Sequence, residues 1–277
     1  MKITRVNQPP KLPPRPVEGH KGMFGRVLVV GGNHAMIGAP VLAGTAALRC
    51  GSGLVQIAVL KSNLPGTLSI TPELIGLELE DDHAVAEAAE KADAIVLGPG
   101  LGQTPLAVKR VRQLIKIEKP MVIDADGLNI LSAMKKWPPD FKAKAVLTPH
   151  PGEMTRLNQL LGRGKTPSDQ TGRIELATFA ASQFGVVLLL KGHRTVVTDG
   201  KRVYINKTGD SSLSKAGAGD VLSGILGCFL GQKMEGFGAA ALAAHLHGRA
   251  GQMAGKKLGR RSVLARDVIG ELGECLR

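Results

Sequence analysis

Aromatic residues are scarce in this sequence: they make up 3% of its 277 residues, with one Trp and one Tyr. A chain with so few rings has little with which to stack the bases of single-stranded nucleic acid. Hydrophobic residues still reach 43%, so the core must be built from Ala, Val, Leu, Ile and Gly. Such a composition argues against disorder and suits helices packed closely on a parallel sheet.

Cysteine and long apolar runs are also lacking. Cys50, Cys228 and Cys275 lie in apolar, helix-like contexts without a C-x-x-C pair, so we expect buried free thiols in a reducing compartment. No apolar run approaches the roughly 18 residues that a membrane span needs. Residues 1–20 are polar and Pro-rich rather than a signal peptide. We therefore expect a cytoplasmic protein without a membrane partner.

The charge is strongly positive, with a formal net value of +13, which favours anionic partners. The basic residues are scattered, so we interpret them mainly as a solvated surface with some phosphate-facing members, and we expect no nucleic-acid partner. A non-catalytic nucleic-acid-binding protein is the alternative of a different class. It would bind DNA or RNA with a steep salt dependence and would be indifferent to nucleotides.

Strand-like and helical patterns alternate along most of the chain. The Pro-rich residues 7–16 predict an extended arm, since proline fixes φ and removes a donor. We divide the chain into an N-terminal arm, 1–17, and one catalytic domain, 18–277. Alternating elements predict βαβ units, and hence an α/β protein with a mostly parallel central sheet covered on both faces. The predicted strands are 27–30, 54–60, 94–97, 121–123, 145–147 and 186–190, with a hairpin of 195–198 and 202–205; the predicted helices are 40–50, 84–92, 106–117, 174–184, 218–230, 236–253 and 262–276.

Six glycine-rich or polar segments follow predicted strands, where ligands bind in open α/β sheets. Neither a G-x-G-x-x-G nor a Walker A pattern is present. Ordinary roles remain open for several of them: tight turns for the glycines, a helix N-cap for Asp126, a structural role for His150 between two prolines, and a hairpin corner for Lys191. The segments are 31–33 with 38–40, 98–102, 124–129, 148–153, 191–195 and 215–220.

The segment Lys215–Asp220, K-A-G-A-G-D, carries the strongest signal. Two glycines at a helix N-terminus present free N–H groups to an anion. Asp220 in the first turn can take a proton from a hydroxyl as its oxygen attacks phosphorus. An ordinary capped helix would explain Asp220 but not the spacing of the glycines.

Taken in order, the motifs resemble the NAD(P)H-hydrate dehydratase family of the ribokinase-like superfamily over roughly residues 18–275. They are H-K-G-x-x-G from His20, G-G, G-P-G-L-G, D-A-D-G-L-N, T-P-H-P-G-E, K-G-x-x-T and A-G-A-G-D. The resemblance implies a three-layer α/β/α sandwich and a hydro-lyase of metabolite repair. Such an enzyme phosphorylates the hydroxyl of hydrated NADH or NADPH with ATP or ADP, and loss of phosphate then restores the ring double bond.

The same resemblance assigns the site. It makes Asp220 the base. It also implies a homotetramer and a separate epimerase protein. The phosphate chemistry leads us to expect Mg²⁺, although no self-contained metal cage is readable. The implied nucleotide-binding residues are Lys191, Gly192, His193, Arg194, Thr195, Gly217, Ala218 and Gly219; the implied substrate-binding residues are Ala39, Pro40, Gly98, Gly100, Gly102, Asp124, His150 and Asp220.

Three residues depart from the family pattern. Ala218 stands where the family usually has the Thr of G-G-T-G-D, Asp210 stands for the Asn of T-G-N, and Pro40 replaces a small residue of the substrate turn. Asp210 would bring a negative charge near phosphates. The alternative within the same fold is a small-molecule kinase similar to hydroxyethylthiazole kinase, whose product stays phosphorylated.

Overall fold

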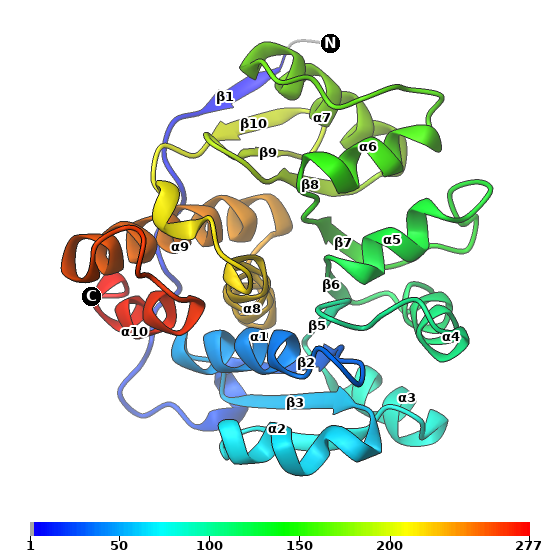
Figure 1. Cartoon of the computed structure of the whole chain (residues 1–277), viewed down its shortest axis with the longest axis vertical. Coiled ribbons are helices and arrows are strands. Elements are labelled where there is room, and N and C mark those ends of the chain that lie inside the picture. The colour runs from blue at the N-terminus through cyan, green and yellow to red at the C-terminus, as the bar shows by residue number, and fades with distance from the viewer. Residues whose placement is uncertain (1–2) are drawn as a thin grey trace.

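The computed structural model describes residues 3–277, which are built around one ten-stranded sheet with the order β1-β10-β9-β8-β7-β6-β5-β2-β3-β4 (Figure 1). Neighbouring strands are parallel except that β9 runs antiparallel to both β8 and β10. The strands are β1 Thr4–Val6, β2 Arg26–Val30, β3 Leu54–Val59, β4 Ile75–Glu78, β5 Ala94–Leu97, β6 Pro120–Ile123, β7 Lys144–Leu147, β8 Val187–Leu190, β9 Val196–Thr198 and β10 Arg202–Ile205.

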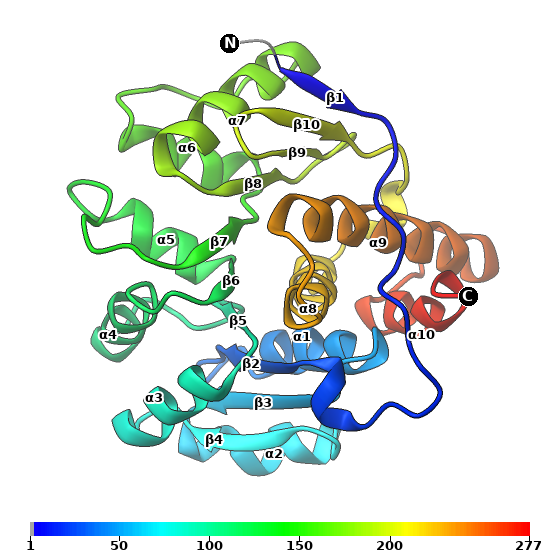
Figure 2. The ribbon, with the colours of Figure 1, turned by 180° about the vertical axis from the view of Figure 1, so that it is seen from behind.

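Helices cover both faces of this sheet. Two core clusters lie on its opposite sides: one contains residues of α1, α8, α9 and α10, and the other contains residues of α3 to α7. Figures 1 and 2 show the same three layers from opposite sides. The helices are α1 Gly38–Arg49, α2 Leu64–Ile70, α3 Asp82–Lys91, α4 Pro105–Leu114, α5 Asp126–Ser132, α6 Pro151–Gln159, α7 Gln170–Phe184, α8 Ala218–Gly231, α9 Gly236–Leu258 and α10 Ala265–Cys275, with short 3₁₀ turns η1 Lys21–Phe24, η2 Lys61–Asn63 and η3 Ser211–Leu213.

The central strand β2 explains why these apolar runs form strands buried on both faces. Val27 and Val29 belong to one core cluster, whereas Leu28 and Val30 belong to the other. Successive side chains of a strand point to opposite faces, so a strand between two helical layers must be apolar at every position. This confirms the predicted three-layer α/β architecture with a mostly parallel sheet.

The individual predicted elements are confirmed, with shifted ends, but the prediction missed others. Strand β1 forms the sheet edge beside β10, and a strand of three residues is too short to show a usable period. Strand β4 and the short helix α2 were also missed, and no range was predicted for the short helices α5 and α6. Cys50, Cys228 and Cys275 are buried free thiols, as predicted. Within residues 3–277, no helix combines the length and apolar character needed to cross a bilayer.

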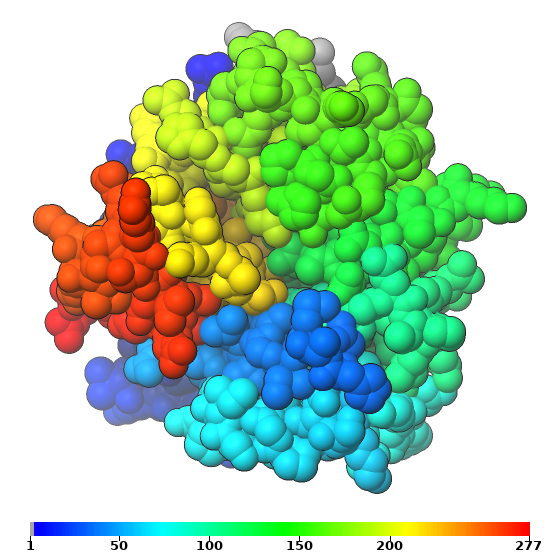
Figure 3. All heavy atoms as spheres, viewed as in Figure 1, coloured from blue at the N-terminus to red at the C-terminus, as the bar shows by residue number. Residues whose placement is uncertain are grey.

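The carboxyl ends of the central strands bring distant segments together. Figure 3 shows the segments near residues 40, 150 and 215, coloured blue, green and yellow, meeting in the middle of one face. These segments follow β2, β7 and β10 in the chain. The fold therefore gathers the glycine-rich and polar loops at one edge of the sheet, where ligands of open α/β proteins bind.

Candidate active site

The first turn of α8 carries the carboxyl group of Asp220. Gly217 is the N-cap, with φ of +87°, a left-handed conformation that glycine adopts without strain. A Cβ at this position would also lie 2.7 Å from Cδ1 of Leu42. Asp220 follows in the first turn, partly buried. Burial, and then the negative charge of Asp124, raises the pKa of Asp220 to about 7, so this carboxyl can exchange a proton near neutral pH.

A buried ion pair lies beside this turn. Lys191, after β8, donates from Nζ to Oδ1 of Asp124, after β6, at 2.7 Å, and Ser223 Oγ of α8 donates to Oδ2 at 2.7 Å. Burial alone would raise the pKa of Asp124, but the charge and hydrogen bond of Lys191 outweigh it and hold that pKa below its ordinary value. Burial would likewise lower the pKa of Lys191, yet Asp124 and Glu153 raise it. Both partners therefore stay ionised.

A cavity of about 440 Å³ opens between the β8–β9 loop, the segment after β10, and helices α8 and α9. Seven of the eight residues predicted to bind nucleotide line it: Lys191, Gly192, His193, Arg194, Thr195, Ala218 and Gly219. Gly217 does not belong to this lining; a Cβ at this position would meet Leu42 and Ala265 instead. The sequence prediction missed ten lining residues: Asn206, Thr208, Gly209, Ser211, Leu213, Ser214, Leu222, Ala244, His247 and Gly248.

Arg173 of α7 holds the β8–β9 loop from behind. Its guanidinium donates to the carbonyl oxygens of Leu190 at 3.3 Å, Lys191 at 3.2 Å and His193 at 2.7 Å. The side chain is almost fully buried, and a Cβ on Gly192 would lie 2.9 Å from its Nη2. The planar fork of arginine thus fixes the backbone that carries Lys191. Sequence reasoning missed Arg173, because in a helical pattern it is one of many basic residues.

The loop of residues 98–102 packs against two of the other predicted segments. Gly32 N donates to Pro99 O at 2.9 Å, and Gly102 N donates to Oδ2 of Asp126 at 2.7 Å. A Cβ on Gly100 would lie 3.0 Å from that of Ala39. The N-cap role considered for Asp126 is not observed, because Ala125 is the N-cap of α5 and the carboxylate of Asp126 instead accepts the hydrogen bond from the glycine loop.

His150 caps α6. Its Nδ1 accepts hydrogen bonds from the N–H groups of Gly152 at 3.0 Å and Glu153 at 3.4 Å, and Oε2 of Glu153 accepts from His150 N at 2.7 Å. This capping box gives His150 a structural role, while half of its side chain stays exposed. Glu153, which belongs to the predicted segment 148–153, is buried, and its Oε2 lies 3.8 Å from Lys191 Nζ.

The departures from the family pattern have structural settings. Asp210 lines the cavity, but its Oδ2 is 3.1 Å from Nε of Arg260, so its charge is offset. Pro40 is buried against the Gly31–Gly32 turn and shapes that turn. Ala218 is buried at the start of α8 and lines the cavity with its neighbours, where the Thr of the family would place a hydroxyl.

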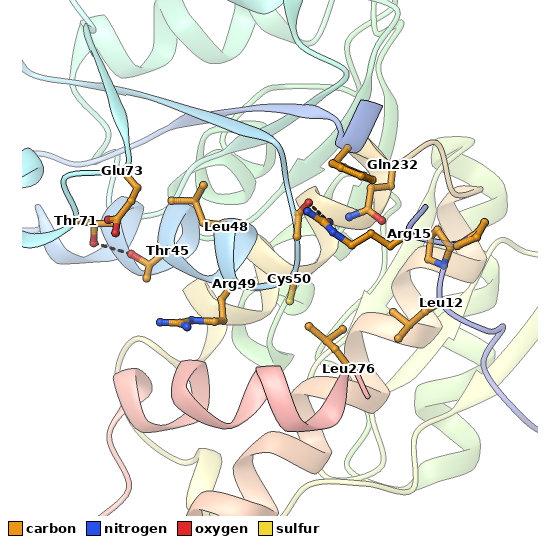
Figure 4. Close-up of a pocket in the computed structure, with 14 residues that line it drawn as sticks. Leu12, Arg15, Thr45, Leu48, Arg49, Cys50, Thr71, Glu73, Gln232 and Leu276 are labelled. Carbon is orange, nitrogen blue, oxygen red and sulfur yellow. Dashed lines mark hydrogen bonds between the residues drawn. The ribbon is translucent and has the colours of Figure 1, made fainter. Parts of the chain in front are cut away.

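A second cavity, of about 570 Å³, lies at the other edge of the sheet (Figure 4). It is bounded by the C-terminal end of α1 and by residues 12–15 of the N-terminal segment, and none of the predicted site residues lines it. Arg15 donates to the carbonyl oxygen of Gly51 at 2.8 Å and stacks 3.8 Å over the Phe24 ring. We interpret this cavity as the place where the arm is anchored.

A mostly parallel sheet whose late helix begins with Gly-Asp beside a cavity and a buried Lys–Asp pair defines a ribokinase-like α/β enzyme. A ribokinase-like superfamily protein from Enterococcus faecalis shares this fold, with a TM-score of 0.82 over 95% of this chain and 90% of the other, at 24% identity. The chain belongs to the NAD(P)H-hydrate dehydratase family, whose model matches residues 27–273.

Two relatives support this assignment. A bifunctional NAD(P)H-hydrate repair enzyme of Moorella thermoacetica is 41% identical over 96% of this chain and 52% of its own length. An ADP/ATP-dependent NAD(P)H-hydrate dehydratase from Bacillus subtilis, co-crystallised with ATP and Mg²⁺, is 30% identical, with a TM-score of 0.83 over 96% of this chain and 93% of the other. The chain spans about half the length of the curated bifunctional relatives it matches.

Proposed function

We propose that this chain dehydrates hydrated NADH or NADPH at the expense of ATP or ADP. The observation that carries the proposal is the position of Asp220: a carboxyl with a pKa of about 7 stands in the first turn of a helix whose first residues line a nucleotide-sized cavity. A base at the positive end of a helix, next to Lys191, suits phosphoryl transfer to an alcohol.

The chemistry follows from leaving-group strength. Asp220 takes the proton of the ring hydroxyl while the oxygen attacks the terminal phosphorus, and the bond from that phosphorus to the donor nucleotide breaks. Free N–H groups of the α8 turn and the Lys191 ammonium stabilise charge on the transferring phosphoryl. Phosphate then leaves with the electrons of the carbon–oxygen bond, and a proton leaves the neighbouring ring carbon. Hydroxide would leave far more slowly, so phosphorylation makes the elimination possible.

The two sides of the site take different ligands in this proposal. The cavity between the β8–β9 loop and α9 holds the nucleotide, with residues 191–195 and 218–219 around it, and Gly217 allows the tight turn that begins α8. The hydrated dinucleotide lies on the other side of Asp220, against Ala39, Pro40, Gly98, Gly100, Gly102, Asp124 and His150. Support for this division comes from the contacts that join residues 31–40, 98–102 and 124–126 into one surface.

Mg²⁺ is proposed to arrive with the nucleotide. Magnesium sites commonly use one or two carboxylates together with substrate phosphates, and the carboxylate of Asp220 stands at the anion-binding turn. In the part of the chain that the structure describes, no group of three or more His, Cys, Asp or Glu side chains is placed to hold a metal. The phosphates would therefore supply the remaining ligands, and the ion would neutralise part of their charge.

Further features follow the family rather than the geometry. We propose that each chain consists of an arm, 1–17, and a catalytic domain, 18–277, and that four chains form a cytoplasmic homotetramer. We also propose that this enzyme works with a separate epimerase that interconverts the two forms of the hydrate. The bifunctional names of its relatives support a functional link to a second activity.

The direct test is incubation of the protein with hydrated NADH and either ADP or ATP while the absorbance of reduced nicotinamide is followed. Recovery of that absorbance, dependent on nucleotide, is expected. A thiazole alcohol is the competing acceptor: its phosphorylation, without any recovery of nicotinamide absorbance, would establish the small-molecule kinase instead.

A further inference from the structure

His247 of α9 is a buried imidazole that the proposed chemistry does not use. Six buried side-chain nitrogen or oxygen atoms in the described part of the chain have no hydrogen-bond partner there, and Nε2 of His247 is one of them. Unlike a buried polar atom inside a packed core, this residue lines the cavity assigned to the nucleotide. Leaving such an atom without a partner costs free energy, so a partner supplied by a ligand would explain its presence.

The imidazole stays neutral. Burial lowers the pKa of His247 to about 4, and the positive charge of Lys191 contributes in the same direction. A neutral imidazole carries one N–H donor and one lone pair, so it can bond a hydroxyl or accept or donate at a polar oxygen without adding charge to the cavity.

The helix pair α8–α9 defines where His247 stands along the cavity. These consecutive helices pack against each other, and the imidazole hydrogen-bonds the backbone of Ala218, at the start of α8, which raises its pKa but less than burial lowers it. Nε2 is the ring nitrogen that is left without a partner. Ala244, one turn earlier on α9, and Leu222, one turn later on α8, also line the cavity. The apolar side chains of Ala244 and Leu222 suit contact with the nucleobase of ADP or ATP. His247 and Ala218 therefore lie nearer to the end where ribose and phosphates would bind.

We propose that Nε2 of His247 makes a hydrogen bond to the ribose–phosphate part of the bound nucleotide and so positions it for phosphoryl transfer. The proposal rests on the nucleotide-dependent function given above. It makes His247 a positioning residue, with Asp220 remaining the group that moves the proton. ADP and ATP share the ribose and the first two phosphates, so this contact serves both donors equally.

The experiment compares His247→Leu with wild type by calorimetric titration with ADP and with ATP, and by thermal unfolding without nucleotide. Leucine fills much of the space without a polar atom. We expect affinity for both nucleotides to fall about threefold to tenfold, the effect of one lost neutral hydrogen bond. We also expect the melting temperature without nucleotide to stay equal or rise, because an unsatisfied buried nitrogen has been removed.

Two further variants complete the test. His247→Gln, whose amide reaches about as far as Nε2, should recover part of the affinity. His245→Leu is the matched control, since His245 lies two residues away on α9 and is only half-buried, outside the cavity lining; its nucleotide affinity should equal that of wild type. A merely structural His247 would show the opposite pattern, a lower melting temperature with unchanged affinity.

Failure of this inference can be told apart from failure of the proposed function. If wild type restores hydrated NADH and His247→Leu binds nucleotide as tightly as wild type, the inference is wrong and the function stands. If wild type binds neither ADP nor ATP, both are overturned.

Discussion

Asp220 is the residue on which the proposed chemistry depends, and its replacement by asparagine removes the charge while keeping the shape of the side chain. Asp220→Asn keeps the size of the side chain but cannot accept the hydroxyl proton. We expect turnover of hydrated NADH to fall by about 10²- to 10⁴-fold, the range typical for a lost general base. Nucleotide affinity, measured by titration calorimetry, should change little. Turnover within a few-fold of wild type would show that another group takes the proton.

The pH dependence of the same residue gives a second prediction. The base must be ionised, and its pKa in the free enzyme is raised to about 7, so kcat/KM, which reports the free enzyme, should rise as the pH increases from 6 to 8, with an inflection near 7. A profile that is flat over this interval would contradict the assignment of Asp220 as the titrating base.

The free energy of unfolding should fall as the pH rises, whereas activity should increase. A carboxyl whose folded-state pKa lies above its unfolded value stabilises the fold at low pH, and this contribution is lost as the pH rises from about 4 to about 7. Asp220→Asn removes the effect. Chemical denaturation should therefore find the variant more stable than wild type at pH 8, by on the order of 4 kcal/mol, and nearly equal to it at pH 4. A difference independent of pH would exclude this origin.

At the scale of the element, the start of α8 contains two glycines with different roles. Gly217 has a positive φ and no room for a Cβ, so Gly217→Ala should destabilise the fold by about 1–3 kcal/mol. A Cβ on Gly219 would meet Lys191 Nζ at 3.5 Å, an ordinary contact. Gly219→Ala should leave stability unchanged or slightly higher but place a methyl group where phosphate must approach. Denaturation and nucleotide titration of both variants check the contrast; equal effects on both measurements would refute it.

The contact between Arg173 of α7 and the β8–β9 loop gives a prediction about how two elements depend on each other. Arg173→Lys replaces the fork that holds three carbonyl oxygens with a single ammonium. We expect the KM for nucleotide to rise about tenfold through a less ordered loop, with kcat nearly unchanged, because Arg173 does not line the cavity. Arg163→Lys is the control, since Arg163 is exposed and stacks on Phe179. An unchanged KM in Arg173→Lys would mean that the loop is ordered without the fork.

The elements that sequence could predict are those whose signal is local. Continuous apolar runs such as 94–97 and 186–190 mark strands buried on both faces, and the glycines after them mark the loops at the carboxyl edge. Strand β4 is half-exposed at the sheet edge, and α5, with seven residues, is too short to show a helical period. These segments form through contacts with the rest of the fold, which a local pattern does not contain.

The site was predictable to the extent that it is made of loops. Lys191 and Asp220 stand in motifs with a chemical reason for each residue type. Ser223, His247 and Arg173, in contrast, reach the site from helix positions, where a polar residue in an apolar helix could equally face solvent. Only the packing of α7, α8 and α9 reveals which way they point.

At the scale of the whole molecule, the N-terminal segment ties the two ends of the sheet together. It starts as β1 beside β10 and then runs along the molecule to η1, next to β3 (Figure 2). Val6 and Leu12 pack against the core, and Arg15 binds the turn at Gly51. None of these residues lines the nucleotide cavity. We therefore expect the arm to stabilise the fold and not to take part in the proposed reaction.

Removal of residues 1–16 tests this role. Losing two packed aliphatic side chains and the pairing of β1 should cost about 3–6 kcal/mol, which corresponds to a melting temperature lower by roughly 5–10 °C or more. Turnover of hydrated NADH at 25 °C, where the shortened protein remains folded, should stay within about twofold of wild type. Arg15→Ala is a milder variant for comparison, because it removes only the anchor in the second cavity. Its melting temperature should lie between those of wild type and the shortened protein. A shortened protein that melts like wild type, or one that is folded but has lost nucleotide binding, would show that the arm does something other than brace the sheet.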